Sequence, residues 1–547
     1  MKKKIENNNI FIRLEEIKLL LDEDEGLLID KISQVLEIDS GEIINFVIVK
    51  KAIDSRNKNR IIFVYSLDVK LKNHQNLIKK IKLPSKDFYE KIIKYKIREQ
   101  EAYIYKIEKK SAQVKNRPLI VGSGPSGLFC ALVLAKAGLK PTIIERGADV
   151  KSRIRDVEKF FKTGDLNLNS NIQFGEGGAG TFSDGKLYTS INNPRTKFIF
   201  DELIKAGAPR EIAWSAHPHI GTDKLREVVK NIRKKIENLG GEIRFNSCLT
   251  DIDVQNGKIA SALINQNEWI NEDCVVIAIG HSARDTYEML YQKGLIMSPK
   301  TFSIGIRIEH KAEMINKAQY GKFFNHPKLP AARYKLVAHL SNNRSVYTFC
   351  MCPGGYVIAA ASEKDKLVVN GMSKYAQDNE NSNCALLVNI FPSDFMVGNH
   401  LAGINFQREW EEKAFLLGGG KYRAPIQLLG DFLKSKKSKK IESIAPSYRP
   451  GVTLTDLNEC LPVFVTESIR EALPILDKKI RGFAHPDAVL TGIESRSSSP
   501  VRIFRDNNFE SSIKGIFPAG EGAGYSGGIT SSAIDGIMIA ESILKKY

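Results

Sequence analysis

The chain has 547 residues, too many for one ordinary hydrophobic core, and its length predicts about three domains. Its 42% hydrophobic and 26% charged residues are typical of a soluble globular protein, and no stretch approaches the roughly 18 uninterrupted apolar residues of a membrane span. Seven thinly spread cysteines favour a reduced intracellular protein over a disulfide scaffold, and the first residues lack the apolar run of a secretory signal. We therefore expect a cytoplasmic protein.

Basic residues concentrate in one stretch. Residues 51–120 contain 19 Lys and Arg but 7 Asp and Glu, so this stretch carries a net +12 of the chain's +18. A solvated lysine-rich helix and a grip on nucleic acid are both compatible with such a run. The stretch lacks the interleaved glycine and aromatic pattern of an RNA-recognition strand, so nucleic-acid binding is the less favoured alternative.

In chain order, the first expected unit is a small α+β domain over residues 1–72. Helix-period patterns cover 14–21 and 27–38, and two apolar stretches joined by the polar connector SRNKN predict strands. A βαββ module fits these elements. Residues 73–116 then form a predicted basic helical linker with few turn signals.

From Pro118 onward the pattern changes to strand, helix, strand. RPLIVGSG predicts a short buried strand, SGLFCALVLAKAGL a helix rich in small residues, and PTIIERG the next strand. This succession is typical of the beginning of a parallel sheet. Several short strands are expected over 240–283, mixed elements over about 300–480, and a strand, glycine loop and helix at the C-terminal end.

The turn between that first strand and helix has the spacing of a dinucleotide-binding turn. Gly122 permits the tight turn, Gly124 lets the backbone approach a pyrophosphate, and Gly127 allows the helix to pack closely on the strand. The helix N-terminus then presents free N–H groups to the phosphates. Glu145 lies 23 positions after Gly122, where an acid hydrogen-bonds ribose hydroxyls.

Three later segments also contain glycine turns, and they are NIQFGEGGAGTFSDGKLYTS (171–190), CVVIAIGHSARDTY (274–287) and GIFPAGEGAGYSGGITSSAIDG (515–536). Together with the first turn they resemble the flavoprotein superfamily with two dinucleotide-binding domains, whose FAD domain is split by a substrate domain. The resemblance implies non-covalently bound FAD, with its ADP half at the first turn. It also implies that Glu521, where the superfamily usually has Asp, contacts the ribityl chain.

The same resemblance implies an α/β fold: a three-layer, split FAD-binding domain of Rossmann type, an inserted α+β substrate domain, and a ferredoxin-like α+β domain at the N-terminus. The FAD-binding parts are expected at 117–298 and 482–547, and the substrate domain at 299–481. The residues that this implies for cofactor binding are Gly122, Gly124, Pro125, Ser126, Gly127, Glu145, Arg146, Gly177, Gly178, Thr181, Leu249, Ala278, Gly280, Gly520, Glu521, Gly527, Gly528, Ile529 and Thr530.

Further segments indicate one family within this superfamily. FGEGGAGTFSDGKL, HPHIGTDKLR, FSIGIRIEH, YTFCMCPGGYV and SRSSSPVRI together are similar to a family of bacterial FAD-dependent dehydrogenase-like proteins with a small N-terminal α+β domain and no assigned substrate. The likeness covers nearly the whole chain. It implies a flavoprotein of dehydrogenase or reductase type and no particular reaction.

Four side chains are candidates for catalysis. Cys350 and Cys352 alternate on a predicted strand, which puts both thiols on one side with Cα atoms about 6.5–7 Å apart, near the limit for a disulfide. Cysteines packed in a strand are the favoured alternative. His219 could donate a proton to substrate, although a helix-entry turn is the preferred interpretation, and His281 could lie near the cofactor or in an ordinary polar loop.

The predicted function is an FAD-dependent oxidoreductase that transfers a hydride between flavin N5 and a small-molecule substrate. Arg496 and Arg502 flank a serine run that could hold an anionic substrate or pair with acids. With one convincing dinucleotide turn, NAD(P)H is expected only as a transient electron donor, and no Cys or His spacing indicates a metal. Two alternatives stay open: a flavin-dependent RNA-modifying enzyme, and a non-enzymatic flavin-binding redox sensor or scaffold.

Overall fold

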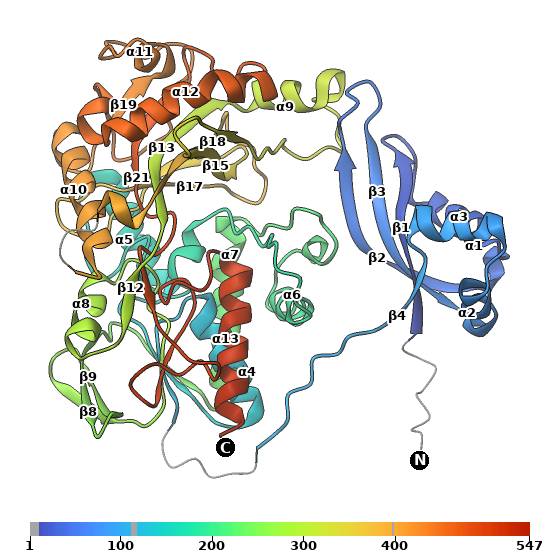
Figure 1. Cartoon of the computed structure of the whole chain (residues 1–547), viewed down its shortest axis with the longest axis horizontal. Coiled ribbons are helices and arrows are strands. Elements are labelled where there is room, and N and C mark those ends of the chain that lie inside the picture. The colour runs from blue at the N-terminus through green and yellow to red at the C-terminus, as the bar shows by residue number, and fades with distance from the viewer. Residues whose placement is uncertain (1–9, 111–116, 396–398, 547) are drawn as a thin grey trace. The chain divides into compact units, whose positions relative to one another are not determined.

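The computed structural model describes residues 10–110, 117–395 and 399–546. The described residues divide into two compact units, of which the first comprises 10–106, 209–218 and 319–330 and the second the remainder from 107 onward. Figure 1 labels the helices and strands of both units. No helix within the described ranges combines the length and the apolar character needed to cross a membrane.

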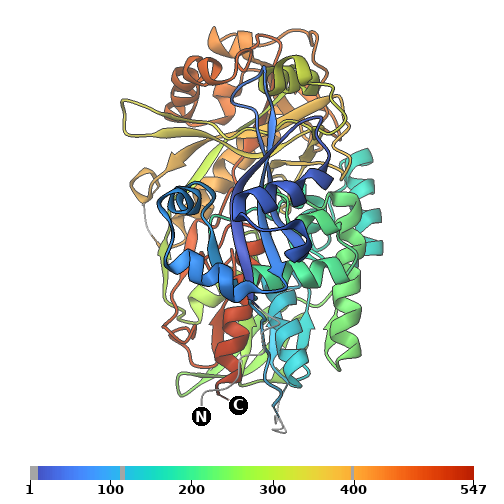
Figure 2. The same cartoon turned by 90° about the vertical axis from the view of Figure 1, so that its right-hand side faces the viewer.

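The first unit is a four-stranded sheet with helices on one face (Figures 1 and 2). Its elements are β1 (Ile10–Leu20), α1 (Leu28–Leu36), β2 (Ile43–Asp54), β3 (Ile62–Leu71), α2 (His74–Lys82), α3 (Lys86–Tyr95) and β4 (Arg98–Glu101). The strands stand in the order β2-β3-β1-β4, and each neighbouring pair is antiparallel. The ferredoxin-like arrangement implied by the resemblance is therefore present.

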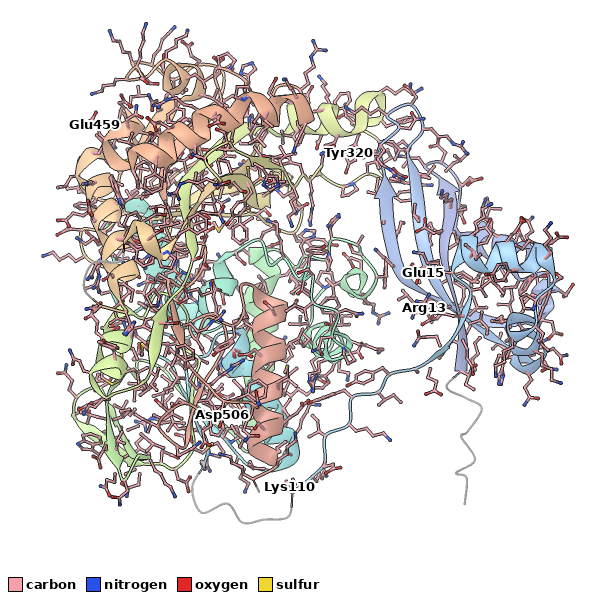
Figure 3. The ribbon with its side chains drawn as sticks, viewed as in Figure 1. Arg13, Glu15, Lys110, Tyr320, Glu459 and Asp506 are labelled. Atoms are coloured by element: carbon pink, nitrogen blue, oxygen red, sulfur yellow. The ribbon has the colours of Figure 1, made fainter. Side chains whose placement is uncertain are left out.

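A bulge in β1 explains why its sequence resembles a helix. Leu14 and Ile17 are both buried, although a regular strand buries every second residue. The pairing register with β3 shifts between them, and Glu16 has a φ of 58°. Figure 3 labels Glu15, the preceding residue of the chain. The extra residue creates a three-residue step between buried positions, which is helix spacing. The helical pattern at 14–21 is therefore a wrong prediction.

Residues 73–116 differ from the predicted linker. Helices α2 and α3 bury Leu77 and Phe88, respectively, while their lysines stay at the surface. Strand β4 then pairs with β1 and completes the sheet. Its sequence, REQE, has no apolar alternation, so only backbone pairing makes it a strand. Residues 111–116 of the predicted linker lie outside the described residues.

The second unit contains the predicted parallel sheet. Its strands stand in the order β23-β11-β5-β6-β7, all parallel, and they are β5 (Leu119–Val121), β6 (Thr142–Ile144), β7 (Glu242–Arg244), β11 (Val275–Ile277) and β23 (Ile516–Pro518). Four of the five are buried throughout, as expected for a parallel sheet that is covered on both faces. The C-terminal β23 joins β11 at one edge.

Two layers cover this sheet, which makes the three layers that were predicted. On one face α4 (Pro125–Ala137) lies beside α13 (Ile529–Leu544) and α7 (Thr222–Asn238) (Figure 1). The other face packs against an antiparallel sheet of β8 (Leu249–Gln255), β9 (Lys258–Ile264) and β10 (Glu268–Asn271). The core between the two sheets contains Leu119, Val121, Val275 and Ile277 from the parallel strands.

The inserted domain is built on a seven-stranded sheet in the order β14-β15-β18-β13-β21-β19-β20. Its strands are β13 (Phe302–Lys311), β14 (Val337–His339), β15 (Ser345–Cys352), β18 (Asn381–Ile390), β19 (Ala424–Leu428), β20 (Val452–Leu454) and β21 (Val489–Glu494). All neighbours are antiparallel except β19 and β20. The same stretch of chain contains β16 (Tyr356–Ala359), β17 (Val369–Met372), α9 (Ala312–Tyr320), α10 (Ala402–Leu417), α11 (Leu429–Leu433) and α12 (Val463–Lys479).

The inserted sheet extends past the predicted boundary at 481. Strand β21 pairs with both β13 and β19, so residues 489–494 lie in the middle of the seven-stranded sheet. An apolar strand shows no preference for one sheet over another in its sequence, which is why the boundary was placed too early. The remaining elements are β12 (Met297–Pro299), which pairs with β22 (Val501–Ile503), and the helices α5 (Val150–Thr163), α6 (Arg195–Lys205) and α8 (Arg284–Gln292).

Candidate dinucleotide site

The turn after β5 contains two kinds of glycine. A Cβ at Gly122, where φ is +104°, would lie 2.4 Å from the carbonyl oxygen of Ala278, and a Cβ at Gly127 would lie 2.0 Å from that of Gly122. Packing therefore requires glycine at these two positions. A Cβ at Gly124 would meet nothing closer than Gly178 Cα, at 4.0 Å. The turn is open at Gly124, where a ligand can approach the backbone.

Pro125 and Ser126 form the first turn of α4. The Ser126 hydroxyl is buried and makes no hydrogen bond within the described ranges. The backbone N–H groups of a helix's first turn have no partner inside the helix, and the helix dipole adds partial positive charge there. This end of α4 therefore offers donors suited to a phosphate.

The glycine-rich loop at 171–190 packs on the same turn. The N–H of Gly177 donates to the Ser123 carbonyl at 3.1 Å, and a Cβ at Gly178 would lie 3.1 Å from Gly124 Cα. Thr181 is fully buried, and its hydroxyl donates to a backbone carbonyl of the same loop at 2.8 Å. The two glycines thus border the turn, while the Thr181 side chain holds the loop in shape.

The C-terminal glycine loop closes on the same place. A Cβ at Gly520 would lie 2.9 Å from Ser126 Cβ, and one at Gly522 would lie 2.7 Å from the Gly280 carbonyl oxygen. The N–H of Gly520 also donates to Asp535 of α13 at 2.7 Å. Segments from three parts of the chain therefore meet at the carboxyl ends of β5, β11 and β23. Open α/β sheets bind their ligands at this edge.

Three more glycines border open space at this edge. A Cβ at Gly280 or Gly527 would meet no atom within 4 Å, and one at Gly528 would meet only a serine hydroxyl at 3.9 Å. None of the three is required by a neighbouring atom. Like Gly124, they leave room for a ligand beside the backbone.

Helix α13 begins at Ile529 and is tied to the glycine-rich loop. The hydroxyl of Thr530 donates to the carbonyl of Leu187 at 2.7 Å, and Ile529 lies 3.5 Å from the position of a Cβ on Gly180. The loop that borders the first turn at Gly178 therefore also reaches the N-terminus of α13. The loop thus contacts both the first glycine turn and the N-terminus of α13.

Glu145, at the end of β6, is buried and accepts four hydrogen bonds. Its Oε2 accepts from the N–H and the hydroxyl of Ser123 at 2.9 and 2.8 Å, and its Oε1 from the N–H groups of Gly147 and Gly175 at 3.0 and 2.9 Å. A carboxylate has about four lone-pair sites, so all are engaged. Glu145 holds the loops together, and its predicted contact to ribose stays a prediction that requires one of these bonds to give way.

Three other residues predicted to contact the cofactor lie around the sheet edge. Arg146 pairs with Asp285 at 2.7 Å, and its guanidinium lies 4.6 Å from the centre of the Phe174 ring. Ala278 follows β11 and is buried. The Leu249 side chain packs in the hydrophobic core between the sheets, so only its backbone is left to contact a ligand.

His281 and Glu521 lie together between β11 and the C-terminal loop. The Nδ1 of His281 lies 3.1 Å from Oε1 of Glu521, a hydrogen bond in which the imidazole donates to the carboxylate. The other imidazole nitrogen, Nε2, is buried and makes no hydrogen bond within the described residues. The sequence placed these residues 240 positions apart, and the fold joins them as a polar pair beside the open glycines.

His219 lies at a different point, beside Lys186. The two residues form an isolated β-bridge. The imidazole stacks on the Tyr375 ring at 5.6 Å, and its Nε2 lies 3.3 Å from the Tyr375 carbonyl oxygen. His219 precedes α7, as the helix-entry interpretation predicted. Its β-bridge partner, Lys186, contacts the two candidate cysteines.

Cys350 and Cys352 end β15 at an irregular point. The register with β18 shifts between Phe349 and Cys352, and Cys350 has a φ of 43° in the left-handed region. The Nζ of Lys186 lies 3.6 Å from both sulfur atoms. The register shift interrupts the regular strand here, and both sulfur atoms contact the same ammonium group.

Lys186 and its partner Asp184 were not among the residues predicted from the sequence. The two form a salt bridge at 3.0 Å, and Asp184 is buried. Both lie in the loop 171–190, which was chosen for its glycines, and no spacing links them to cysteines 164 positions away. The sequence signal for this pair was a lysine and an aspartate next to a glycine turn. Only the fold shows that the two thiols lie beside Lys186.

The two thiols have opposite acidities. The neighbouring Cys352 thiol holds the pKa of Cys350 well below its usual value, and the charges of Lys186 and Arg307 act in the same direction against burial. The neighbouring Cys350 sulfur, together with burial, raises the pKa of Cys352. A thiolate at Cys350 with a protonated Cys352 is therefore the favoured state.

Arg496 and Arg502, which were considered for an anionic substrate, already have partners, as does the fully buried Arg307, which pairs with Glu494 on β21. Arg496 pairs with Glu411 at 2.8 Å. Arg502 donates to a backbone carbonyl at 3.3 Å. These arginines hold acids and backbone in place, and an anionic substrate stays a prediction. The residues that the structure describes include no group of three or more His, Cys, Asp or Glu arranged to hold a metal.

Family comparisons identify the class of this chain. A model described as FAD-dependent protein, C-terminal domain-like, matches residues 301–497, an NAD(P)-binding Rossmann-like domain matches 120–171, and a domain of unknown function matches 11–70. An uncharacterized protein of Clostridium beijerinckii is 49% identical over 538 residues, which cover 98% of this chain and 99% of that one. The chain belongs, with that protein, to a family of FAD-dependent proteins.

Similar solved structures include several enzymes, one of them a flavin-dependent brominase. L-Proline dehydrogenase from P. horikoshii is 13% identical, with 80% of this chain and 94% of that chain covered and a TM-score of 0.33. L-Amino acid deaminase from Proteus myxofaciens is 11% identical, covering 82% and 94% with a TM-score of 0.31. A flavin-dependent brominase is 12% identical, covering 79% of each chain with a TM-score of 0.37. Likeness at these TM-scores carries no argument about the reaction.

Proposed function

We propose that this chain binds FAD non-covalently and acts as an oxidoreductase that moves a hydride between flavin N5 and a small-molecule substrate. Bound FAD supplies the hydride chemistry, and the chain supplies binding, orientation and a proton. Membership of an FAD-dependent family supports the cofactor. NAD(P)H is the proposed transient electron donor, and it would bind without a Rossmann turn of its own because the turn at 122–127 serves FAD.

The observation that carries this proposal is the set of open glycines. Gly124, Gly280, Gly527 and Gly528 come from three segments, and none would meet a protein atom closer than 3.9 Å if it carried a Cβ. Such a cradle fits a long, flat ligand whose backbone contacts would be lost if side chains filled the space. The buried and unpartnered Ser126 hydroxyl adds a donor for the phosphates.

The chain's own residues then have distinct parts in binding. The N-terminus of α4 would face the pyrophosphate, and Ser126 would donate to it. His281 and Glu521 would bind the ribityl hydroxyls. Nε2 of His281, which makes no hydrogen bond within the described residues, would form an additional hydrogen bond with them. The N-terminus of α13 would direct its free N–H groups at the pyrimidine edge of the flavin, where negative charge gathers on reduction.

The FAD assignment is tested with Gly124→Val. The nearest protein atom to a Cβ at this position is 4.0 Å away, so the side chain would extend into the space that we propose for the pyrophosphate. We expect purified Gly124→Val to be colourless, with FAD content below about a tenth of wild type, which corresponds to a loss of at least about 1.4 kcal/mol in binding. The control is thermal unfolding of FAD-free protein, which should match between variant and wild type.

A variant that retains full FAD content would contradict the proposed position of the pyrophosphate.

The oxidoreductase activity has a separate test. Anaerobic mixing with NADH, NADPH and candidate metabolites should bleach the flavin absorbance with at least one donor, and a second compound should restore it. If no donor reduces the flavin at a useful rate, the redox-scaffold alternative is favoured over the enzyme.

A further inference from the structure

Cys350 differs from the other cysteines of the chain. Burial raises the pKa of Cys130, Cys248, Cys274, Cys384 and Cys460, and none of these has a lysine within hydrogen-bond distance in the described residues. Cys350 is partly exposed, has a lowered pKa and shares the ammonium of Lys186 with Cys352, which is fully buried. A partly exposed cysteine with a lowered pKa thus lies beside a fully buried one.

We propose that Cys350 and Cys352 form a redox-active dithiol–disulfide pair that reduces small disulfides, with Cys350 as the attacking thiol and Cys352 as the resolving thiol. The accessible member is the one that must meet a disulfide first. The buried member needs to reach only its neighbour: both sulfur atoms lie 3.6 Å from Lys186 Nζ, and the Cys352 thiol donates to the Cys350 carbonyl at 3.3 Å. Lys186 stabilises the anionic sulfur in each step because it lies 3.6 Å from both.

The reaction balances without another reactant. The Cys350 thiolate attacks one sulfur of a small disulfide, a mixed disulfide forms, and the first thiolate leaves and takes up a proton. Cys352 then loses its proton and attacks the Cys350 sulfur, so the Cys350–Cys352 bond forms and the second thiol leaves. Two protein thiols are oxidised, two electrons pass to the small disulfide, and two small thiols are released.

The backbone at Cys350 favours this chemistry over simple packing. A left-handed φ of 43° is strained for a residue with a Cβ, and a neighbouring Gly354 has a φ of 44°. Arg307 adds a hydrogen bond from its Nη1 to the Cys350 carbonyl at 3.1 Å, which anchors the bulge. A buried structural cysteine requires neither a bulge nor a shared cation.

The pair can be examined in a single peptide. Trypsin cleavage after Arg344 and Lys364 releases residues 345–364, which contain Cys350 and Cys352 and no other cysteine. The purified full-length protein is incubated with oxidised glutathione, trapped with N-ethylmaleimide and analysed by mass spectrometry. We expect this peptide to lose about 2 Da and to take up no maleimide, and dithiothreitol should restore two reactive thiols.

Variants separate the two roles. Cys352→Ser should stop the reaction at a glutathione adduct on Cys350, whereas Cys350→Ser should leave Cys352 unreacted. Cys248→Ser is the matched control, because it removes a partly exposed thiol elsewhere and should not alter oxidation of the peptide. The proposal is overturned if the wild-type peptide takes up two maleimides after glutathione treatment, or if it is neither oxidised nor alkylated.

Lys186→Met tests the role of the ammonium. Removing the positive charge should raise the pKa of Cys350, so the rate of maleimide addition at pH 7 should fall at least about tenfold and recover at higher pH. An unchanged rate and pH profile would show that Lys186 does not activate the thiol. None of these measurements depends on bound FAD, so they succeed or fail independently of the proposed oxidoreductase activity.

Discussion

At the residue scale, the candidate site uses glycine for two different purposes. Gly122 and Gly127 face protein atoms at 2.4 Å or less from an added Cβ, so packing alone excludes other residues there. Gly124 and Gly527 face open space, so the protein itself would accept a side chain. Spacing in the sequence predicted a tight turn at Gly122, close packing at Gly127 and an open backbone at Gly124, whereas Gly527 was implied by the flavoprotein resemblance. The open positions are those where we expect a substitution to change binding without changing the fold.

Glu145 stands at the position that the dinucleotide motif predicts, but its carboxylate accepts hydrogen bonds from the surrounding loops. Its distance from the glycine turn predicted a ribose ligand, and its position at the end of β6 agrees with that motif. Four hydrogen bonds from the surrounding loops nevertheless engage both oxygens. Those donors are backbone N–H groups and one serine from separate segments, which no spacing rule connects.

A residue-scale prediction concerns His310, which is fully buried on β13. Its Nε2 donates to the Phe483 carbonyl at 2.7 Å, and burial lowers its pKa to about 4. Between pH 6.5 and 4 the unfolded chain binds a proton that the folded chain refuses, so the free energy of unfolding falls as the pH falls. We expect His310 to account for about 2 kcal/mol of the loss between pH 7 and pH 5.

Urea unfolding of wild type and His310→Gln at both pH values measures this contribution. The variant should lose about 2 kcal/mol less than wild type over the interval. His339→Gln is the control, because His339 is exposed, and it should keep the wild-type pH dependence. An equal loss in wild type and His310→Gln would contradict the assignment.

At the scale of elements, packing forms helices and a strand where the lysine-rich composition predicted a linker. Lysine-rich residues after 72 gave a linker prediction, yet α2 and α3 each bury one side chain, and β4 pairs with β1. One buried residue per helix is too weak a pattern to stand out among so many charges. In contrast, α4 and α13 were predicted from their small apolar residues, which allow close approach: a Cβ on Gly536 of α13 would lie 2.1 Å from the Ser126 carbonyl oxygen.

An element-scale prediction concerns the ion cluster that joins α8 to α10. Glu411 of α10 is fully buried and accepts from Arg284 of α8 at 2.7 and 2.8 Å and from Arg496 at 3.0 and 2.8 Å. Glu411→Gln removes the negative charge and leaves two buried guanidinium groups with less compensation. We expect the free energy of unfolding to fall by about 3–5 kcal/mol.

Chemical denaturation at pH 7 measures this loss, and the neighbouring position supplies the control. Glu412 is exposed and pairs with Lys366 at 2.6 Å, so Glu412→Gln should cost no more than about 1 kcal/mol. Similar losses for the two variants would mean that the cluster does not contribute through its buried charge.

At the scale of the whole molecule, the parallel sheet is assembled from distant parts of the chain. β5 and β23 flank β11 and are separated by the whole inserted domain, whose seven-stranded sheet includes β21. The candidate site lies where these parts meet, so neither part forms it alone. Contact between α4 and α13 holds the two parts together, along with the pairing of β23 with β11 (Figure 1).

A prediction at this scale follows from linkage between binding and folding. A ligand that binds only the folded chain stabilises it by about 2.7 kcal/mol at a concentration 100 times its Kd. We expect the Tm of FAD-free protein to rise as FAD is added, measured by differential scanning fluorimetry or calorimetry. Gly124→Val and Gly527→Val, which lie in the two distant parts, should each abolish the rise.

The same titration distinguishes the two halves of the site. If Gly527→Val responds to FAD as wild type does, the C-terminal loop is not part of the cradle, whereas Gly124→Val tests the first turn separately. Because both glycines border open space, FAD-free variants should unfold at the wild-type temperature. A lowered Tm without FAD would indicate that the space at that glycine belongs to the fold.

FAD was implied by the resemblance of glycine-rich segments along the chain to a flavoprotein superfamily. The local patterns of this sequence were sufficient for the strand, glycine turn and helix at 119–137 and for the parallel sheet, because glycine spacing and strand–helix alternation act within a few residues. Contacts between distant segments were beyond their reach. Lys186 beside Cys350 and Cys352, Glu521 beside His281, and β21 within the inserted sheet each join residues that share no periodicity. Folding brings such groups together through packing of whole elements, and the chemistry proposed for the thiol pair depends on that proximity.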